Sequence, residues 1–301
     1  MSARPEIVLL TEDRYEDPTP GAHWYTDNIL ADDRLLIEGL AARGVDAQRR
    51  SWSRADIAWG SFPLAVFRTT WDYFERFAEF MTWLDATERQ TTLVNPPALV
   101  RWNVDKRYLW ELDRRGVHTV PGLLLPRGST DGLGELMQTH GIDDAVLKPV
   151  VSGAARNTYR VRRADAAEHE ATLARLLTEE AMMLQPFQRD IVERGETTLV
   201  VIDGQVTHGL RKVAKPGDFR VQDDHGGSVH PYEPTAEEVA FAERAMAACD
   251  PAPLYGRVDM IRDNDGQLAV MELELVEPEL WLRMCPPAAD RLAAALVRAL
   301  D

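Results

Sequence analysis

The stretch that decides the fold reads Tyr255-Gly-Arg-Val-Asp-Met-Ile-Arg262, then Asp263-Asn-Asp-Gly266, then Gln267-Leu-Ala-Val-Met-Glu-Leu-Glu274. Two alternating segments flank an Asp-Gly turn, which is a strong short-range signal for a β-hairpin. Side chains alternate between faces along a strand, so Arg257 shares a face with Asp259, and Glu272 shares one with Glu274. A turn near residues 264–265 sets Asp259 roughly opposite residues 271–272. The hairpin therefore gathers three carboxylates.

Three neighbouring carboxylates repel one another unless a cation neutralises them. Mg²⁺ binds one or two carboxylates and completes its shell with water and nucleotide phosphates. Asp259, Glu272 and Glu274 are therefore candidate magnesium ligands. The alternative is a hairpin whose acidic face is simply solvated.

The composition narrows the class of protein. A length of 301 residues predicts two or three structural units, and 45% apolar residues suffice for packed cores. A net charge of −15 argues against a partner that is nucleic acid or an anionic membrane surface. Cys249 and Cys285 form no metal-ligand pattern and are expected to be reduced core thiols. With no signal peptide and no membrane span in the sequence, we expect a soluble cytoplasmic protein.

The first hundred residues alternate between strand and helix patterns. Short apolar runs at residues 7–10, 64–68 and 93–94 predict strands, and residues 45–52 are interpreted as a further strand. Helical spacing between the strands predicts crossover helices and a parallel sheet. Ligands collect at the carboxyl ends of such strands. The loop Thr70-Trp71-Asp72-Tyr73 lies at such an end and is a candidate substrate-binding loop. The alternative is helix capping by Thr70 or Asp72.

The middle of the chain carries features of a nucleotide site. Lys148 ends an apolar strand and precedes a turn that contains Ser152 and Gly153, where small residues let backbone N–H groups approach phosphate oxygens. The turn does not match the P-loop pattern. The segment Gln185-Pro186-Phe187 closes another apolar strand and suits a nucleotide base, although a plain strand-to-loop transition explains it equally well.

The remaining segments predict a second hairpin around residues 203–204 and helices over residues 103–116, 236–249 and 287–300. Residues 215–227 are polar and basic, contain Phe219, Arg220 and Gln222, and are predicted to be a mobile lid. An ordinary surface loop is the alternative.

Seven motifs, each weak alone, follow one another along the chain: Lys106, Lys148 before a small-residue loop, Gln185-Pro-Phe187, Gly195-Glu196, Arg211-Lys212, Arg257-Val-Asp259, and Met271-Glu-Leu-Glu274. In this order they resemble the ATP-grasp ligases. The resemblance implies an α/β and α+β fold. An N-terminal parallel-sheet domain (residues 1–103) precedes an ATP-grasp small subdomain (104–185) and a large subdomain with the metal site (186–301). It also implies ATP and Mg²⁺ as cofactors.

The resemblance assigns roles residue by residue. Arg257, Lys148 and Arg220 are the expected catalytic residues, with Arg257 stabilising the transferring phosphoryl group. The expected metal ligands are Asp259, Glu272 and Glu274, of which Glu274 replaces the asparagine of many relatives. The expected nucleotide contacts, including Glu193 on the ribose, are Lys106, Lys148, Ser152, Gly153, Gln185, Pro186, Phe187, Glu193 and Lys212. The expected substrate contacts are Thr70, Trp71, Asp72, Tyr73, Arg220 and Arg257.

The substrate loops resemble a small branch of the family near glutathione synthetase, and within it the cyclo-ligases that act on O-ureido-D-serine. This implies a small amino-acid-derived substrate whose own carboxylate is activated and attacked within the same molecule. Dimers are common among such enzymes, so a homodimer is one expected assembly. The alternatives are a ligase that joins an amino acid to a second amine, a carboxylate kinase, and a nucleotide-binding protein without turnover.

Overall fold

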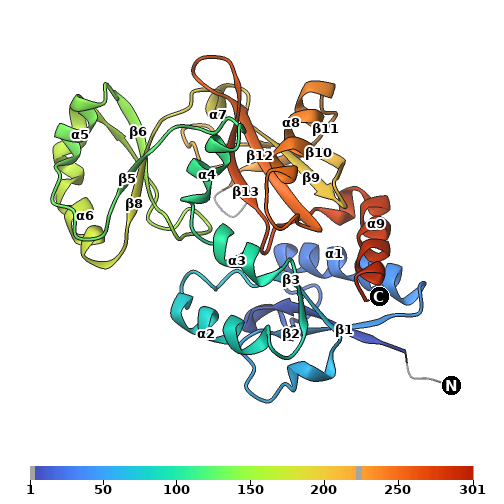
Figure 1. The fold of residues 1–301 in the computed structure, drawn as a ribbon. Helices are drawn as coiled ribbons and strands as arrows, with labels where there is room; N and C mark the ends of the chain where they lie inside the picture. The colour runs from blue at the N-terminus through green and yellow to red at the C-terminus, as the bar shows by residue number, and fades with distance from the viewer. Residues whose placement is uncertain (1–3, 222–225, 301) are drawn as a thin grey trace.

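The computed structural model describes residues 4–221 and 226–300, and these fold into three β-sheets with flanking helices (Figure 1). The predicted combination of one parallel sheet with an ATP-grasp-like pair of lobes is confirmed. The predicted boundaries at residues 103 and 185 remain a prediction. None of the described helices has the length and apolar character to cross a membrane.

The N-terminal sheet is parallel, with strand order β2-β1-β3-β4. Its strands are β1 (Glu6–Thr11), β2 (Asp46–Ser51), β3 (Leu64–Thr69) and β4 (Thr92–Val94). The helices that accompany it are α1 (Trp24–Ala41), α2 (Phe77–Thr87) and α3 (Pro97–Asn103), with short 3₁₀ turns η1 (Asp13–Tyr15) and η2 (Trp59–Ser61). Continuous apolar runs form β1 and β3 because helices cover both faces of a parallel sheet.

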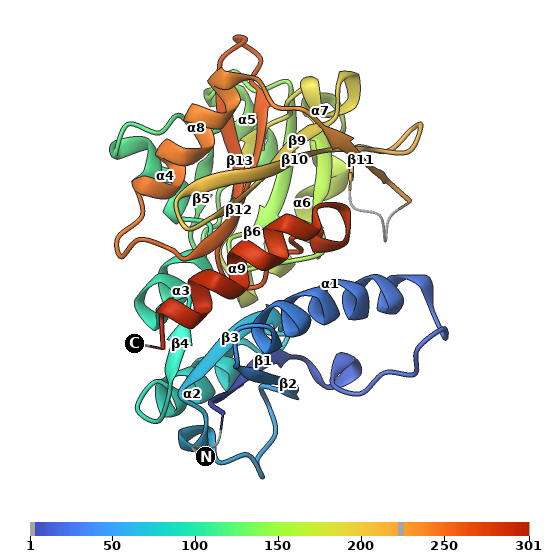
Figure 2. The same ribbon diagram turned by 90° about the vertical axis from the view of Figure 1, so that its right-hand side faces the viewer.

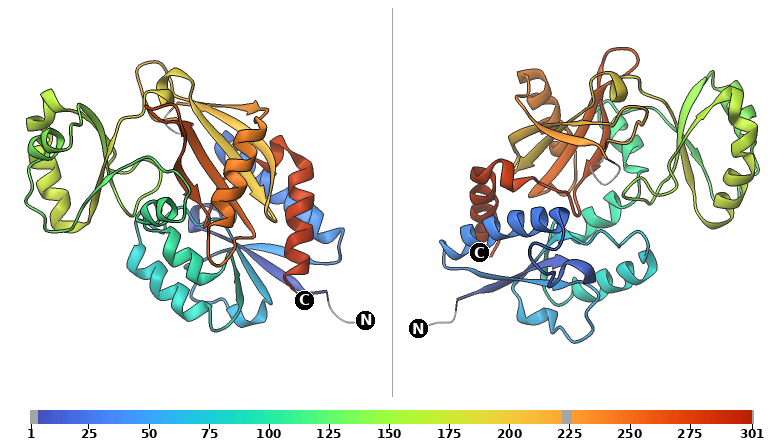
Figure 3. Two further views of the ribbon diagram at one scale, coloured as in Figure 1. Left: turned by 45° about the horizontal axis from the view of Figure 1, so that its top comes forward. Right: turned by 180° about the vertical axis from the view of Figure 1, so that it is seen from behind.

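The small lobe is a self-contained antiparallel sheet with order β5-β8-β6-β7, and it extends to one side of the molecule (Figures 1 and 3). Its elements are β5 (Leu123–Leu125), α5 (Leu133–Thr139), β6 (Asp144–Pro149), β7 (Tyr159–Arg162), η3 (Arg163–Asp165), α6 (Ala166–Glu179) and β8 (Met182–Pro186). Both helices pack on the sheet through one apolar cluster that includes Leu133, Leu147 and Leu173.

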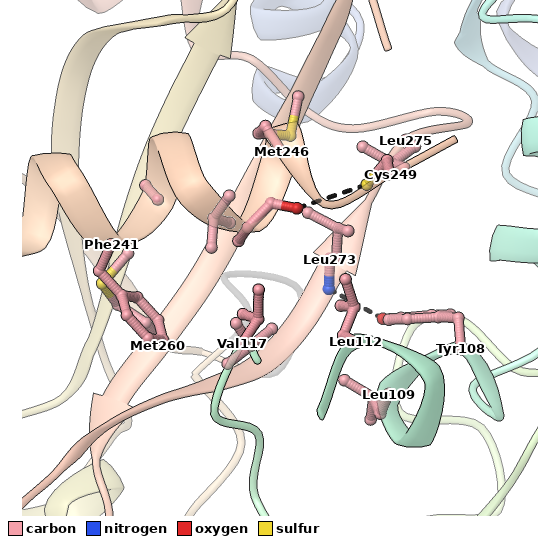
Figure 4. Packing of buried hydrophobic residues seen from close by; sticks show 14 of the residues in the cluster. Tyr108, Leu109, Leu112, Val117, Phe241, Met246, Cys249, Met260, Leu273 and Leu275 are labelled. Carbon is pink, nitrogen blue, oxygen red and sulfur yellow. Dashed lines mark hydrogen bonds between the residues drawn. The ribbon is translucent and has the colours of Figure 1, made fainter. Parts of the chain in front are cut away.

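The large lobe is an antiparallel sheet with order β11-β10-β9-β12-β13. Its elements are α4 (Tyr108–Arg114), α7 (Asp190–Glu193), β9 (Glu196–Ile202), β10 (Gln205–Val213), β11 (Ser228–Tyr232), α8 (Ala236–Ala247), β12 (Tyr255–Arg262) and β13 (Leu268–Glu274). Figure 4 shows α8 residues Phe241 and Met246 packed against the hairpin, and α4 residues Leu109 and Leu112 beside them. Helix α4 falls in the predicted small subdomain by sequence, yet it shares the large-lobe core.

The hairpin forms as predicted. Gly266 has φ of +83°, a left-handed conformation that glycine adopts without steric cost, and the register pairs Asp259 with Glu272 and Arg257 with Glu274. The register shifts once between Asp259 and Met260, so the turn and this irregularity together set which charged side chains face one another.

The helix predicted over residues 103–116 forms as α4, but its predicted start is wrong, because α3 ends at Asn103 and α4 begins only at Tyr108. The break supplies partners to β13, which is the edge strand of its sheet. The Asn103 amide donates to the carbonyl oxygen of Leu273 and accepts from the N–H of Leu275, both at 2.8 Å, and the Leu273 N–H donates to the Tyr108 hydroxyl at 2.8 Å (Figure 4). Unpaired backbone groups must be satisfied when buried, and a continuous helix could not bring these side chains to the edge.

The last helix, α9 (Pro286–Arg298), follows η5 (Leu282–Met284) and returns to the N-terminal domain, where it lies beside α1 (Figure 2). One apolar cluster contains Leu9 of β1, Leu36 of α1, Ile202 of β9 and Leu292 of α9. The N-terminal domain and the large lobe therefore share a hydrophobic core.

Candidate active site

A pocket lies between the small and large lobes and contains most of the predicted site residues. Its polar lining comprises Lys106, Lys148, Ser152, Gly153, Thr158, Gln185, Gln188, Glu196, Lys212, Arg220, Arg257, Asp259, Glu272 and Glu274. Strands β6 and β8 supply the small-lobe wall, and β9, β10, β12 and β13 supply the opposite wall.

Lysine is a rare residue in this chain, which makes its distribution informative. The sequence contains lysine at positions 106, 148, 212 and 215, while its other basic side chains are arginines. The first three of these lysines line the pocket. A compact ammonium group suits a phosphate oxygen as a point charge. The pocket therefore concentrates the group that binds phosphate.

Lys148 has no ion pair or hydrogen bond through its ammonium group among the described residues, although it faces the pocket. Burial lowers the pKa of Lys148 to about 8, and the nearby Glu272 opposes that shift. Lys106 is held in place, because its Nζ donates to the carbonyl oxygen of Ser152 at 2.6 Å and lies 3.0 Å from Glu272. Lys148 is thus available to an anionic ligand.

Asp259 is the centre of a buried ionic cluster and is only 1% exposed. Its carboxylate accepts from Lys212 Nζ at 2.9 Å, from Thr198 Oγ1 at 2.8 Å, and from Arg257 Nε and Nη2 at 3.0 and 2.9 Å. Adjacent strands bring these groups together, since Asp259 pairs with Thr198 across β12 and β9. Burial alone raises the pKa of Asp259, but Arg257 and Lys212 outweigh it and lower the pKa to about 2.

The two glutamates of β13 face the pocket more openly than Asp259. The side chains of Glu272 and Glu274 are 31% and 25% exposed. Burial tends to raise the pKa of Glu272, but Lys106 and Lys148 lower it overall. Burial raises the pKa of Glu274 to about 7, although Arg257 contacts its carboxylate.

The three predicted metal ligands, Asp259, Glu272 and Glu274, are only partly arranged to bind a metal ion. Over residues 4–221 and 226–300, no three His, Cys, Asp or Glu side chains stand close enough together to hold an ion. The oxygens of Asp259 are already taken by protein donors, whereas Glu272 and Glu274 fit the one or two carboxylates that Mg²⁺ uses beside phosphates. The metal-ligand roles remain predictions.

The opposite end of the pocket is apolar and suits a flat ring. Its walls are Val120, Val146, Phe187, Ile191, Phe219, Val221 and Met271. Phe187 is stacked by the Arg160 guanidinium at 3.5 Å and meets the Phe219 ring edge-on at 6.1 Å. The Gln185 amide donates to the Val120 carbonyl oxygen at 3.1 Å, which fixes the strand end.

A second pocket adjoins the first on the side of the N-terminal domain. Both pockets are lined by Lys106, Ser152, Gly153, Ala154, Lys212, Arg257, Glu272 and Glu274. The N-terminal domain adds Trp71 and Tyr73 from the predicted substrate loop, together with Tyr15 and Tyr25. Gly153 is required by packing, because a Cβ there would come within 2.6 Å of the Phe74 ring.

Several predicted residues lie away from both pockets. Thr70 is buried and lines neither pocket, and Asp72 instead accepts from Trp52 Nε1 at 2.7 Å and from Arg76 at 2.9 Å. Glu193 is exposed at the end of α7, outside the pocket lining. Gln222 of the predicted lid lies outside the described residues. Cys249 and Cys285 are free thiols.

The sequence reasoning missed other lining residues. Glu196, which the motif Gly195-Glu196 contains without predicting a role for it, lines the pocket beside Lys212. Tyr15, Tyr25 and Glu277 line the second pocket. Tyr15 lies in η1 and Tyr25 in the first turn of α1, both in the connection that follows β1 at the ligand-binding edge of the sheet, and that position is the signal for them.

Two family models match the chain. The model described as "D-cycloserine synthetase DcsG, N-terminal domain" matches residues 7–95, and that of the "RimK-like ATP-grasp domain" matches residues 145–280. The chain belongs to the ATP-grasp ligases and is an ATP-dependent ligase.

Whole-chain comparisons agree with this class. The chain is 33% identical over 286 residues to the cycloserine biosynthesis protein DcsG of Streptomyces lavendulae, which covers 88% of this chain and 92% of that protein. The crystal structure of D-cycloserine synthetase DcsG superposes with a TM-score of 0.84 at 29% identity, covering 98% of this chain and 100% of that one. The ATP-grasp ligase PsnB, solved with a minimal precursor, Mg and ADP, shares the fold with a TM-score of 0.61 at 19% identity, covering 97% of this chain and 98% of that one.

Proposed function

We propose that this ligase closes O-ureido-D-serine into the ring of D-cycloserine, with ATP converted to ADP and phosphate. The observation that carries the proposal is the pair of adjoining pockets with Arg257 in the wall of both. One pocket has the lysines and the apolar slot that a nucleotide needs, and the other is lined by aromatic and acidic groups that suit a small amino acid. The similarity to DcsG along nearly the whole chain supports this substrate.

In the proposed reaction, the substrate carboxylate attacks the γ-phosphorus of ATP and ADP leaves. The ureido nitrogen then attacks the acyl carbon, loses its proton, and expels phosphate as the five-membered ring closes. Water finally cleaves the ureido C–N bond and releases carbamate. Ring closure within one molecule needs only that the chain be held folded, which an enclosed pocket provides.

The protein contributes positioning and charge. Lys106 and Lys148 bind the phosphates, and Arg257 neutralises the charge that builds on the transferring phosphoryl group. Glu272 and Glu274 would hold Mg²⁺, with Asp259 as the predicted third ligand, and the ion would supply further positive charge beside the phosphates.

The test is ADP release with O-ureido-D-serine as the sole amino-acid substrate and the product mass recorded. We expect ADP, phosphate and D-cycloserine without any added amine. A requirement for a second amine would instead indicate a ligase that joins two molecules, and a stable phosphorylated product would indicate a kinase.

A further inference from the structure

The second pocket has more acidic groups than cations to balance them. Its glutamates are Glu75, Glu272, Glu274, Glu277 and Glu279. Glu272 and Glu274 contact Lys106 and Arg257, and Glu279 lies 2.8 Å from Arg283. Glu75 is exposed to solvent. Glu277 is half-buried, and among the described residues no side chain forms an ion pair or hydrogen bond with its carboxylate.

Aromatic groups from the N-terminal domain stand beside Glu277. The Trp71 indole N–H donates to the backbone carbonyl oxygen of Glu277 at 2.9 Å, which fixes this segment against the substrate loop. The Trp71 ring centroid lies 5.7 Å from those of both Tyr15 and Tyr25. Burial raises the pKa of Glu277 to about 8, and the neighbouring Glu274 adds to the shift. Lys106 opposes the shift in pKa only in part, and among the described residues no cation pairs with this carboxylate.

We infer that Glu277 binds the α-ammonium group of the amino-acid substrate, with Trp71, Tyr15 and Tyr25 beside the bound cation. The inference rests on the proposed function, whose substrate carries an ammonium group next to the carboxylate that becomes phosphorylated. Proteins recognise an ammonium ion through a charge-assisted hydrogen bond to a carboxylate and through contact with the faces of aromatic rings. Arg257, in the same pocket, is then left to contact the reacting carboxylate.

The test compares two substrates in two enzymes. One substrate is O-ureido-D-serine, and the other is its α-hydroxy counterpart, which keeps the shape but lacks the positive charge. In the Glu277→Gln variant we expect KM for the amino substrate to rise about 10- to 100-fold. KM for ATP and kcat/KM for the hydroxy counterpart should stay near the wild-type values. Glu277→Asp should restore part of the affinity, and Glu168→Gln, an exposed glutamate on α6, is the matched control.

Two outcomes would overturn the inference: unchanged discrimination between the substrates in Glu277→Gln, or an equal loss with both, which would mark a purely structural role. Failure of the wild-type enzyme to turn over O-ureido-D-serine would overturn the proposed function alone. Calorimetric titration with D-serine and D-glycerate in the presence of a non-hydrolysable ATP analogue then decides the ammonium site. Tighter binding of D-serine that disappears in Glu277→Gln supports the site, and equal binding of both acids by the wild type refutes it.

Discussion

Trp71 and Glu277 are separated by 206 positions in the chain, yet the indole N–H of Trp71 donates a 2.9 Å hydrogen bond to the backbone carbonyl oxygen of Glu277. The bond ties a loop of the N-terminal domain to the segment that follows the β13 glutamates. The lining of the second pocket is therefore formed by residues of the N-terminal domain together with residues from the C-terminal part of the chain.

Replacing Trp71 by Phe should weaken substrate binding without changing nucleotide binding. The variant removes one hydrogen bond worth about 0.5–1.5 kcal/mol, so KM for the amino-acid substrate should rise roughly 2- to 10-fold. The control is Trp83→Phe, because the Trp83 indole N–H is buried with no partner among the described residues. Steady-state kinetics with each substrate varied in turn would check this, and a rise in KM for ATP alone would contradict it.

Replacing Lys148 by Met should abolish most turnover while the protein stays folded. Loss of one group that stabilises a phosphoryl-transfer transition state typically costs about 10²- to 10³-fold in rate. The side chain has no partner in the described structure, so thermal stability should fall little. ADP release and circular dichroism measure the two effects, with Arg34→Met, an exposed cation on α1, as the control. Near-normal turnover would remove Lys148 from the site.

Activity should also fall at alkaline pH. Since the pKa of Lys148 is lowered from 10.5 to about 8, the free enzyme loses this positive charge as the pH rises through that value. We therefore expect kcat/KM for ATP to decrease above about pH 8, and the decrease should disappear in Lys148→Arg, which keeps its charge. An identical alkaline limb in both enzymes would assign it to another group.

Asp259→Asn should destabilise the fold strongly. The substitution breaks the buried ion pairs of Asp259 with Arg257 and Lys212, which then keep, among the described residues, only Glu274 and Glu196 as ion-pair partners. Breaking a buried ion pair typically costs up to about 3–5 kcal/mol of unfolding free energy. Urea denaturation measures the loss, and Asp265→Asn in the exposed hairpin turn is the control.

The same ionic cluster should make the stability of the protein depend on pH in the acidic range. The pKa of Asp259 is depressed from 3.8 to about 2, so its contribution to stability is present above about pH 4 and is lost as the pH falls toward 2. The stability difference between wild type and Asp259→Asn should shrink over that range. A constant difference would show that Asp259 is not charged in the native state.

Asn103→Ala should cost about 2 kcal/mol of unfolding free energy, because it leaves the Leu273 carbonyl and the Leu275 N–H buried without their partner. Chemical denaturation would check the value. Asn28→Ala on α1 removes no comparable pair of bonds and should cost little. An equal loss in the two variants would argue against the edge-pairing role.

The hairpin of β12 and β13 could be predicted because its information is local. An Asp-Gly turn and alternating side chains locate the hairpin, while the pairing of Asp259 with Glu272 also depends on a register shift between Asp259 and Met260 that the alternation does not predict. The predicted contact of Glu193 with the ribose is not borne out by its position, because the start of the next strand was misplaced. Strand β9 begins only at Glu196, so Glu196 lines the pocket while Glu193, one helical turn earlier, is exposed to solvent.

Other parts of the site depend on contacts that no local pattern encodes. Tyr15, Tyr25 and Glu277 come together only when the N-terminal domain packs on the large lobe. The break between α3 and α4 likewise depends on hydrogen bonds to the backbone of an edge strand about 170 residues away in the chain. Such features follow from tertiary packing and cannot be read from spacing.

The return of α9 to the N-terminal domain determines which part of the enzyme is free to move. Leu292 and its neighbours merge the cores of that domain and the large lobe, whereas most apolar residues of the small lobe form a cluster of their own and Met183 of β8 packs into the large-lobe core. Swinging the small lobe breaks few apolar contacts, while separating the other two would expose a whole core to water. Admission of the nucleotide and departure of ADP are therefore expected to proceed by a hinge rotation of residues 123–186. The rotation would carry Ser152, Gly153 and Ala154 away from the amino-acid pocket, while the wall supplied by the N-terminal domain and the large lobe stays in place.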